Sequence, residues 1–582
     1  MIDPVRFEVI RQAIDAAAQE MCVSLYRSAY STNIKTRLDL SCALLDRRGR
    51  VIGQSAGVPC HISAMNLAVP AALRVYGPDN LEPGDQIATN DPYQGATHLN
   101  DIIVIAPLFV RDRLIGYAAN LAHHVDVGGA HAGSLAPSTE VQQEGLILPI
   151  VKIARRGRLD TDVYRMFIAN IRATKETAGD FRAQIAANVT GERRVTELLE
   201  RFGLRDLEEY IEMLFSYTAD RTRIALRKLP EGEYEAEEFE DDDGITDRPI
   251  RFHVRIGVGN GRISFDFSDS DPQRSSSMNA TFTQTFASCA YVTRCLIDRD
   301  VPENDGFFQF IDVYAPRGLV VNAERPAGVA GGWEISLRLC DMLFRAFAGV
   351  LPQAIPAGCK AMVCHAVFGG RHPVTNEEYV FIETLGGGHG GRGGSDGPDA
   401  VQTHHQNSQN TPIEEMEVFY PVRTLRYELI ADSDGAGQYR GGLGVLREYV
   451  FDGHSPEFTI LADRRRFPPR GLFGGENGRA ARYTLIAPDG RSKDLPSKCT
   501  FMVPEGSSVR YETCGGGGYG TPCERDPLLV QRDVAEEKVS VERAARLYRV
   551  AIDPKTRAID EVATRGLRTE QPAFALAESR RG

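Results

Sequence analysis

The sequence lacks the features of a secreted or membrane protein. Its N-terminus has no basic stretch followed by a continuous apolar core, so we expect no secretion signal. The longest apolar run, residues 102–110, is interrupted by Pro107 and is about half of the ~20 residues needed to cross a bilayer. We therefore predict a cytoplasmic protein with no membrane partner.

An excess of positive charge is also missing. The chain has 67 Lys and Arg against 79 Asp and Glu, a formal net charge of -12, and both signs are spread along the sequence. A protein that binds nucleic acid needs a basic face to contact phosphates. We therefore expect no nucleic-acid partner.

Two chemical motifs are absent from the 582 residues. None of the 11 cysteines belongs to a Cys-x-x-Cys pair, and their irregular spacing favours reduced thiols over disulfides or a thiolate zinc site. The chain also has no Gly-x-x-x-x-Gly-Lys-Ser/Thr sequence, although 56 of its residues are glycine. A nucleotide-binding loop of that type is not supported.

The composition present is that of a large folded protein. Hydrophobic residues make up 42% and charged residues 25%, and the length predicts about two to four domains. Helical periodicity covers residues 5–28, about 160–228, and the segment after residue 526. Hairpins are expected at 38–52 and 251–267, and an acidic run at 235–243 is expected to separate the second hairpin from the helices before it.

We therefore predict an α+β, multi-domain protein with mixed or antiparallel β-sheets, long helices and glycine-rich loops. The first expected domain is a metal-binding α+β domain at residues 1–230. A β-rich domain with glycine-rich loops follows at 231–525, and a C-terminal helical segment covers 526–582.

A further hairpin positions the residues with the clearest chemistry. Residues 102–105 and 114–117 are apolar and flank the polar residues 111–113. If the hairpin closes around Asp112, Asp101 lies opposite His123, whereas a closure half a residue later places His124 there. Cross-strand partners have Cβ atoms about 5 Å apart, so an imidazole and a carboxylate at these positions can share one ion.

Two nearby residues extend this pair to a possible metal site. His98 precedes Asp101 by three residues and can fold over as a third ligand. Two imidazoles and a carboxylate suit a divalent transition metal, Zn²⁺, Fe²⁺ or Mn²⁺, with positions open for water or substrate. Asp39 is a possible fourth ligand, although nothing local brings it to the site. The competing interpretation is that the histidines and Asp101 only form hydrogen bonds at a strand end, and that Asp39 is solvated or a cap.

Two Gly-x-Ser-x-Gly matches, at residues 53–57 and 393–397, carry a weaker signal. Pro59 interrupts the helix that should follow the first, and the second lies in a glycine cluster where a chance match is easy. A serine nucleophile is therefore not favoured.

The glycine clusters at 386–397 and 515–520 indicate a backbone that needs positive φ angles or close approach. Such a backbone can form a structural turn cluster or a loop that lines a site or a subunit contact. His389, His404 and His405 are possible ligands there, with packing or solvent-facing roles as the alternative.

Seven segments together make the chain resemble a known family. They are NDPY at 90–93, THLNDI at 97–102, HHVDVGG at 123–129, NIR at 170–172, GDFRAQ at 179–184, NTP at 410–412 and GGGYG at 516–520. Over nearly its full length the chain is similar to the hydantoinase B/oxoprolinase family, the β-type subunits of ATP-dependent cyclic-amide hydrolases such as hydantoinase, 5-oxoprolinase and caprolactamase-like enzymes. It departs from the family pattern at Ala96, Ala132, Ile335 and Leu337, and the last two leave the substrate open.

The resemblance implies a division of labour between two subunits in a hetero-oligomer. An ATP-binding hydantoinase A-type partner subunit would hold ATP with Mg and phosphorylate the oxygen of a small cyclic amide. This chain would then open the ring with a metal-bound water, so no catalytic side chain is named. Carried over position by position, the family's metal ligands fall on His98, Asp101 and His123, with Asp39 a less secure match.

Two other functions stay open. The first is a subunit of an acetone- or acetophenone-carboxylase-like ATP-dependent complex with a related metal site. The second is a non-catalytic scaffold for the ATP-binding subunit, which would bind no transition metal.

Overall fold

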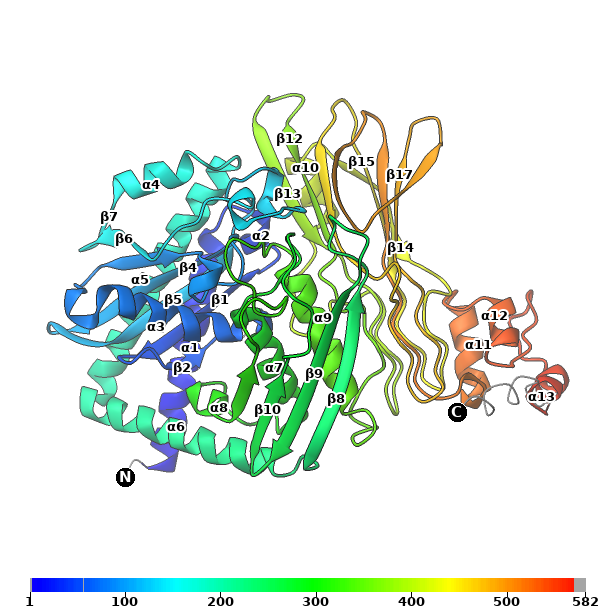
Figure 1. The fold of residues 1–582 in the computed structure, drawn as a ribbon, viewed down its shortest axis with the longest axis horizontal. Helices are drawn as coiled ribbons and strands as arrows, with labels where there is room; N and C mark the ends of the chain where they lie inside the picture. Colours follow the sequence, from blue (N-terminus) through cyan, green and yellow to red (C-terminus); the bar gives the residue numbers. More distant parts are fainter. Residues whose placement is uncertain (1–2, 56, 570–582) are drawn as a thin grey trace.

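The computed structural model describes residues 3–55 and 57–569, and it has the predicted α+β architecture. Figure 1 shows the N-terminal part, blue to cyan, on one side, a green sheet with its helices in the centre, and the yellow and orange strands beyond it. Four separate sheets and several long helices confirm a multi-domain α+β protein. Within the described residues, no helix combines the length and hydropathy of a membrane span.

The N-terminal sheet has seven strands in the order β2-β1-β5-β4-β3-β6-β7. Every residue of β1 is buried, because its alternate side chains point to two covered faces. Cys42 and Leu44 face α1, α5 and α6, whereas Ala43 and Leu45 face α3. The strands are β1 (Leu40–Asp46), β2 (Val51–Gln54), β3 (Gln86–Thr89), β4 (Asp101–Val110), β5 (Arg113–His123), β6 (Val151–Arg155) and β7 (Arg158–Leu159).

The helices of this part follow the predicted periodicity. The stretch 5–28 forms α1, and the helical region from 160 to 228 is divided into three helices. The pairing of β1 with β2 confirms the hairpin at 38–52. The helices are α1 (Pro4–Ser28), α2 (Thr32–Lys35), α3 (Ala64–Tyr76), α4 (Thr161–Ile168), α5 (Thr174–Phe202) and α6 (Leu204–Leu226).

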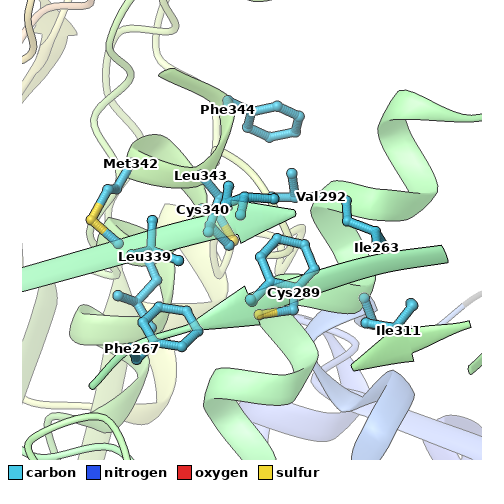
Figure 2. Packing of buried hydrophobic residues seen from close by; sticks show 14 of the residues in the cluster. Ile263, Phe267, Cys289, Val292, Ile311, Leu339, Cys340, Met342, Leu343 and Phe344 are labelled. Atoms are coloured by element: carbon cyan, nitrogen blue, oxygen red, sulfur yellow. The ribbon is translucent and has the colours of Figure 1, made fainter. Parts of the chain in front are cut away.

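The central sheet has the order β11-β10-β9-β8, and its strands are β8 (Gly232–Glu240), β9 (Ile250–Gly259), β10 (Arg262–Asp266) and β11 (Ile311–Tyr314). Helices α7 (Phe282–Leu296) and α9 (Gly332–Ala346) pack on it, with the short α8 (Asp305–Phe308) close by. Figure 2 shows Cys289 of α7 and Leu339 of α9 beside Phe267 in this core. The hairpin at 251–267 is confirmed.

The acidic run corrects one expectation. Residues 235–243 were expected to separate two regions, but residues 235–240 lie in β8, which pairs with β9 along its full length. Because side chains alternate along a strand, Glu233, Glu235 and Glu237 are exposed on one face of β8, while Tyr234 and Ala236 on the other face pack against the central core. Charge density alone therefore gave the wrong role for this segment.

The C-terminal half is a sandwich of two antiparallel sheets, in the orders β13-β12-β16-β19 and β14-β15-β20-β17-β18. Phe368 and Phe458 of one sheet share a core with Tyr449 and Tyr511 of the other. The strands are β12 (His365–Arg371), β13 (Glu378–Thr384), β14 (Arg423–Leu429), β15 (Val445–Val450), β16 (Glu457–Leu461), β17 (Arg482–Ile486), β18 (Ser492–Leu495), β19 (Lys498–Met502) and β20 (Ser508–Glu512). One short helix, α10 (Ile413–Phe419), lies between β13 and β14 in the chain.

Glycine-rich segments stack backbone against backbone beside this sandwich. The amide of Gly516 donates to the carbonyl of Gly442 at 2.9 Å, and the amide of Gly391 donates to the carbonyl of Gly517 at 2.9 Å. A Cβ added at Gly388 would lie 2.0 Å from the amide nitrogen of Gly516. None of these glycines has a positive φ, so close backbone approach is the physical reason for glycine at these positions, whereas Gly394 and Gly520 of the same clusters do have positive φ angles.

The chain continues into short helices, α11 (Pro527–Ala535), α12 (Val541–Arg546) and α13 (Glu561–Thr569). Val534, Ala544 and Tyr548 form a small core of their own. Helical structure is present after residue 526 as the periodicity predicts, but in three short helices, and residues 547–560 between α12 and α13 are not helical. The part of that prediction beyond residue 569 lies outside the described residues.

We expect Asp463→Asn to destabilise the protein by about 3–5 kcal/mol, because it leaves two buried cations without their shared carboxylate. Asp463 accepts from Arg338 and, at 3.0 Å, from Lys498, and all three side chains are fully buried. Burial raises the pKa of Asp463, but Lys498 and Arg338 outweigh it and lower the pKa to about 2.

The sign of the pH dependence follows from that lowered pKa. The stabilisation by Asp463 is present above its unfolded pKa of about 4 and is lost as the pH falls through 2. The free energy of unfolding, measured by denaturant titration at pH 7, 4 and 2.5, should therefore fall more steeply toward low pH in the wild type than in Asp463→Asn. Parallel pH profiles would contradict this account.

Candidate metal centre

The register of β4 and β5 places Asp101 directly opposite His123. This confirms the closure that pairs these two residues and excludes the alternative with His124. His124 instead lies within 2.9 Å of the side-chain oxygen of Gln184 in α5. The loop before β4 folds back so that His98 lies beside Asp101. The amide of Asp101 donates to the carbonyl of His98 at 3.1 Å.

The three predicted side chains meet in the interior. Nε2 of His98 lies 3.2 Å from Nδ1 of His123 and 3.2 Å from Oδ2 of Asp101. Nδ1 of His123 lies 3.1 Å from Oδ1 of Asp101. All three residues are at most 5% exposed. Three donor atoms therefore converge on one buried point.

Neighbouring groups fix the orientation of Asp101. Its Oδ2 accepts from the hydroxyl of Thr97 and, at 3.3 Å, from the indole nitrogen of Trp333 in α9. Burial raises the pKa of Asp101, but the imidazoles of His98 and His123 outweigh it and hold the pKa well below the ordinary value. The carboxyl group is therefore an anion in this setting.

Asp39 reaches the same region through the sheet rather than through local sequence. Because β1 pairs with β5, the carbonyl of Asp39 accepts from the amide of His123 at 3.1 Å. Its carboxylate lies 3.8 Å from Nε2 of His61 and 3.3 Å from the hydroxyl of Ser408. It lines the same cavity, but it is not in the close cluster formed by His98, Asp101 and His123.

The cluster borders a small cavity between the N-terminal sheet, α9 and β12. Its space for water is about 30 Å³, which is room for about one or two water molecules. One wall is apolar and includes Val58, Trp333, Leu337 and Val363. The cavity is therefore too small for a ring-shaped ligand unless wall side chains move.

Three further histidines line this cavity, and sequence reasoning did not place them there. Nδ1 of His61 is 3.0 Å from the hydroxyl of Ser41, and His405 lies 3.2 Å from that of Ser336. Nδ1 of His365 lies 3.3 Å from Glu334, whose carboxylate also accepts from two backbone amides. Burial lowers the pKa of each of these imidazoles, that of His405 to about 3.

Little in the sequence could have found these residues. His61, Trp333, His365 and His405 come from four distant segments, and none belongs to a pattern with ligand spacing. The sequence offered two local signals: His405 as a possible ligand near a glycine cluster, and the departures at Ile335 and Leu337, which lie in the first turns of α9. Only Leu337 of that pair lines the cavity.

The other candidates have different surroundings. Ser55 hydrogen-bonds to Cys42 and Cys22, and Ser395 to the carbonyl of Asp396, so neither bonds to an imidazole in the described part of the chain. Both serines are thus without the base that a nucleophile needs. His389, a separate candidate, donates from Nδ1 to the carbonyl of Gly390 at 3.0 Å.

His404 belongs to a second cluster, with Asp341 and Cys359. Asp341 already accepts from Arg464 at 2.8 Å and from the amide of Cys359 at 2.9 Å. Burial raises the pKa of Cys359 well above its ordinary value, so the thiol is neutral. A paired carboxylate and a neutral thiol describe a hydrogen-bonded network rather than an open cation site.

The first cluster fits a divalent metal. Ligand atoms bound at about 2.1 Å in tetrahedral or octahedral arrangement lie about 3.0–3.4 Å apart, close to the spacings in this cluster. The ring nitrogens outside this cluster, Nδ1 of His98 and Nε2 of His123, have no hydrogen-bond partner among the described residues, so the fit rests on the converging atoms and their donor types. Two imidazoles and one carboxylate are a donor set for Zn²⁺, Fe²⁺ or Mn²⁺.

The fold and the cluster together define a class: a large α+β protein with a buried two-histidine, one-carboxylate centre at the mouth of a β-ribbon. The chain belongs to the hydantoinase B/oxoprolinase family, whose model matches residues 3–522.

Three known proteins illustrate the similarity. The chain is 33% identical to a putative D-/L-hydantoinase B-type subunit from a Pseudomonas species over 95% of each chain. It is 32% identical to 5-oxoprolinase 1 of Arabidopsis thaliana over 89% of this chain. The matched region is only 42% of that longer protein. The crystal structure of an ATP-dependent caprolactamase from Pseudomonas jessenii superposes with a TM-score of 0.91 at 26% identity, covering 98% of this chain and 100% of the other.

Proposed function

We propose that the chain is the hydrolytic, β-type subunit of an ATP-dependent cyclic-amide hydrolase. The observation that carries this proposal is the convergence of His98, Asp101 and His123 on one buried point beside a cavity. These residues would hold Zn²⁺, Fe²⁺ or Mn²⁺, with Asp39 of the same cavity as a possible further ligand. The family membership supports cyclic amides as the substrate class.

A bound metal would supply an activated water near neutral pH and stabilise charge that develops on oxygen. The chain's own residues would prepare the site for it. Thr97 and Trp333 orient Asp101, and the apolar wall excludes bulk water from the reacting carbon. His365, held at Nδ1 by Glu334, presents its other ring edge to the cavity and can hold or release a proton at Nε2.

The proposal also includes a partner. A resonance-stabilised amide is a poor electrophile, and phosphorylation of its oxygen would make it reactive, but this chain has no Walker-type phosphate loop. The Pseudomonas relative, named as one subunit of a hydantoinase, and the much longer 5-oxoprolinase chain support an arrangement in which other polypeptide completes the enzyme. That polypeptide would be an A-type subunit that binds ATP with Mg.

Elemental analysis combined with a substrate panel tests this function. The purified chain should contain about one transition-metal ion. Together with its A-type subunit and ATP, it should open hydantoin, 5-oxoproline or a lactam without fixing labelled bicarbonate onto a ketone. Carbon fixation would favour the carboxylase-like alternative. A chain that binds no metal and is needed only to keep its partner soluble would favour the scaffold.

A further inference from the structure

We propose that Arg37 binds an oxyanion of the ligand that enters the metal-site cavity. The shared chemistry is a phosphoryl or carboxylate group that accepts hydrogen bonds from a guanidinium. This inference rests on the proposed function, because it concerns what the same cavity recognises. It adds an anion-binding position that the metal ligands do not supply.

Arg37 differs from the other fully buried arginines. Five arginines are among the largest fully buried side chains, and four of them have a carboxylate partner within 3.4 Å. Those pairs are Arg338 with Asp463, Arg447 with Glu383, Arg464 with Asp341, and Arg525 with Asp396. For Arg37, no carboxylate oxygen of the described residues lies within 4.0 Å.

The hydrogen bonds of Arg37 go to neutral oxygens. Nε donates to the carbonyl of Gln409 at 3.2 Å, and Nη1 donates to Asn33 at 2.9 Å and to the carbonyl of Ile382 at 2.8 Å. Nη2 donates to the hydroxyl of Thr384 at 2.8 Å. A guanidinium carries five N–H groups, so one Nη2 hydrogen has no acceptor among the described residues.

The location of Arg37 gives this spare donor a use. Its side chain lines the same cavity as Asp101, His123 and Trp333, although Arg37 itself is only 1% exposed. A buried cation without a counter-ion is strongly unfavourable unless something else compensates it. The two acids that act on Arg37 electrostatically, Asp39 and Glu383, lie beyond 4.0 Å from it, and Glu383 already pairs with Arg447. An incoming oxyanion would provide the missing counter-charge.

Trp333 offers a direct readout of this position. It is the single tryptophan of the chain, and it lines the cavity with Arg37. We would load the purified chain with metal and titrate it with inorganic phosphate and, separately, with acetate, while following tryptophan fluorescence. Metal content would be measured before and after each titration.

Three variants separate charge from structure. Arg37→Met removes the charge, and we expect phosphate or acetate affinity to fall about 10- to 100-fold with metal content unchanged. Arg37→Lys keeps the positive charge but lacks the paired N–H donors of a guanidinium. Its affinity for phosphate or acetate should lie between those of the wild type and Arg37→Met. Arg371→Met removes an exposed arginine that does not line the cavity, so its affinity should stay within about threefold of the wild type.

The outcomes are distinguishable. A response to phosphate alone assigns the position to a phosphoryl group, and a response to acetate alone assigns it to a substrate carboxylate. No response in the wild type, or wild-type affinity in Arg37→Met, overturns the inference. If Arg37→Met does not fold, wild-type affinity in Arg37→Lys overturns the inference instead. A loss of affinity in Arg371→Met equal to that in Arg37→Met also overturns it. Absence of metal from the wild-type chain would instead refute the proposed function.

Discussion

On the proposed function, replacing His98 with alanine should abolish metal binding and lower ring opening on the order of 10³-fold or more, while ATP hydrolysis by the proposed partner subunit persists in part. The reason is geometric. Nε2 of His98 is 3.2 Å from both of the other donor atoms, so its loss leaves two ligands and an uncompensated Asp101. Asp101→Ala should have the same effect, because it removes the only anion of the cluster.

The measurement combines metal content with product formation in the reconstituted complex. His372→Ala is the matched control, because His372 lies in the turn between β12 and β13 and its Nδ1 accepts from the backbone amides of Val374 and Thr375. That variant should keep both metal and activity. Full ring opening by His98→Ala with unchanged metal content would refute the assignment of the cluster.

Replacing Gly516 with alanine should destabilise the fold by about 3 kcal/mol or more, or prevent folding. A Cβ at this position would lie 2.1 Å from the carbonyl oxygen and 2.4 Å from the carbonyl carbon of His389. Both are backbone atoms of a neighbouring glycine-rich segment, whose carbonyl also accepts from the amide of Gly442 at 2.8 Å. The segments would have to separate, and their hydrogen bonds would be lost.

Gly349→Ala is the control for this change. A Cβ at Gly349 meets no atom within 4 Å, and the residue has no positive φ. Its free energy of unfolding should stay within about 1 kcal/mol of the wild type. Denaturant titration of both variants tests the comparison. Similar unfolding of Gly516→Ala and the wild type would show that the glycine stack tolerates side chains.

The sequence predicted the part of the site that depends on local order. An apolar strand, a polar turn and a second apolar strand fix which residues face each other, because side chains alternate along a strand and a hairpin sets the register. The pairing of Asp101 with His123 followed from that rule and is confirmed. The return of His98 also followed, since three residues separate it from Asp101.

The remaining cavity residues could not be predicted in this way. Asp39 comes to the site because β1 lies beside β5, and His61, His365 and Trp333 come from segments that meet only when the three main parts pack. The role predicted for the acidic run at 235–243 was wrong for a related reason. Its charges suggested a separator, but pairing with β9 makes most of it a strand. The three-domain division stays a prediction.

By itself, the sequence determined the fold class, the family and the triad of donor side chains, because periodicity, hairpin register and motif spacing act over short stretches of chain. Only the tertiary structure decided how the site is enclosed. It set Trp333 and His365 against the triad, and it left Arg37 as a buried cation without a carboxylate partner among the described residues. Those features depend on contacts between residues hundreds of positions apart, which burial and packing select and local patterns do not record.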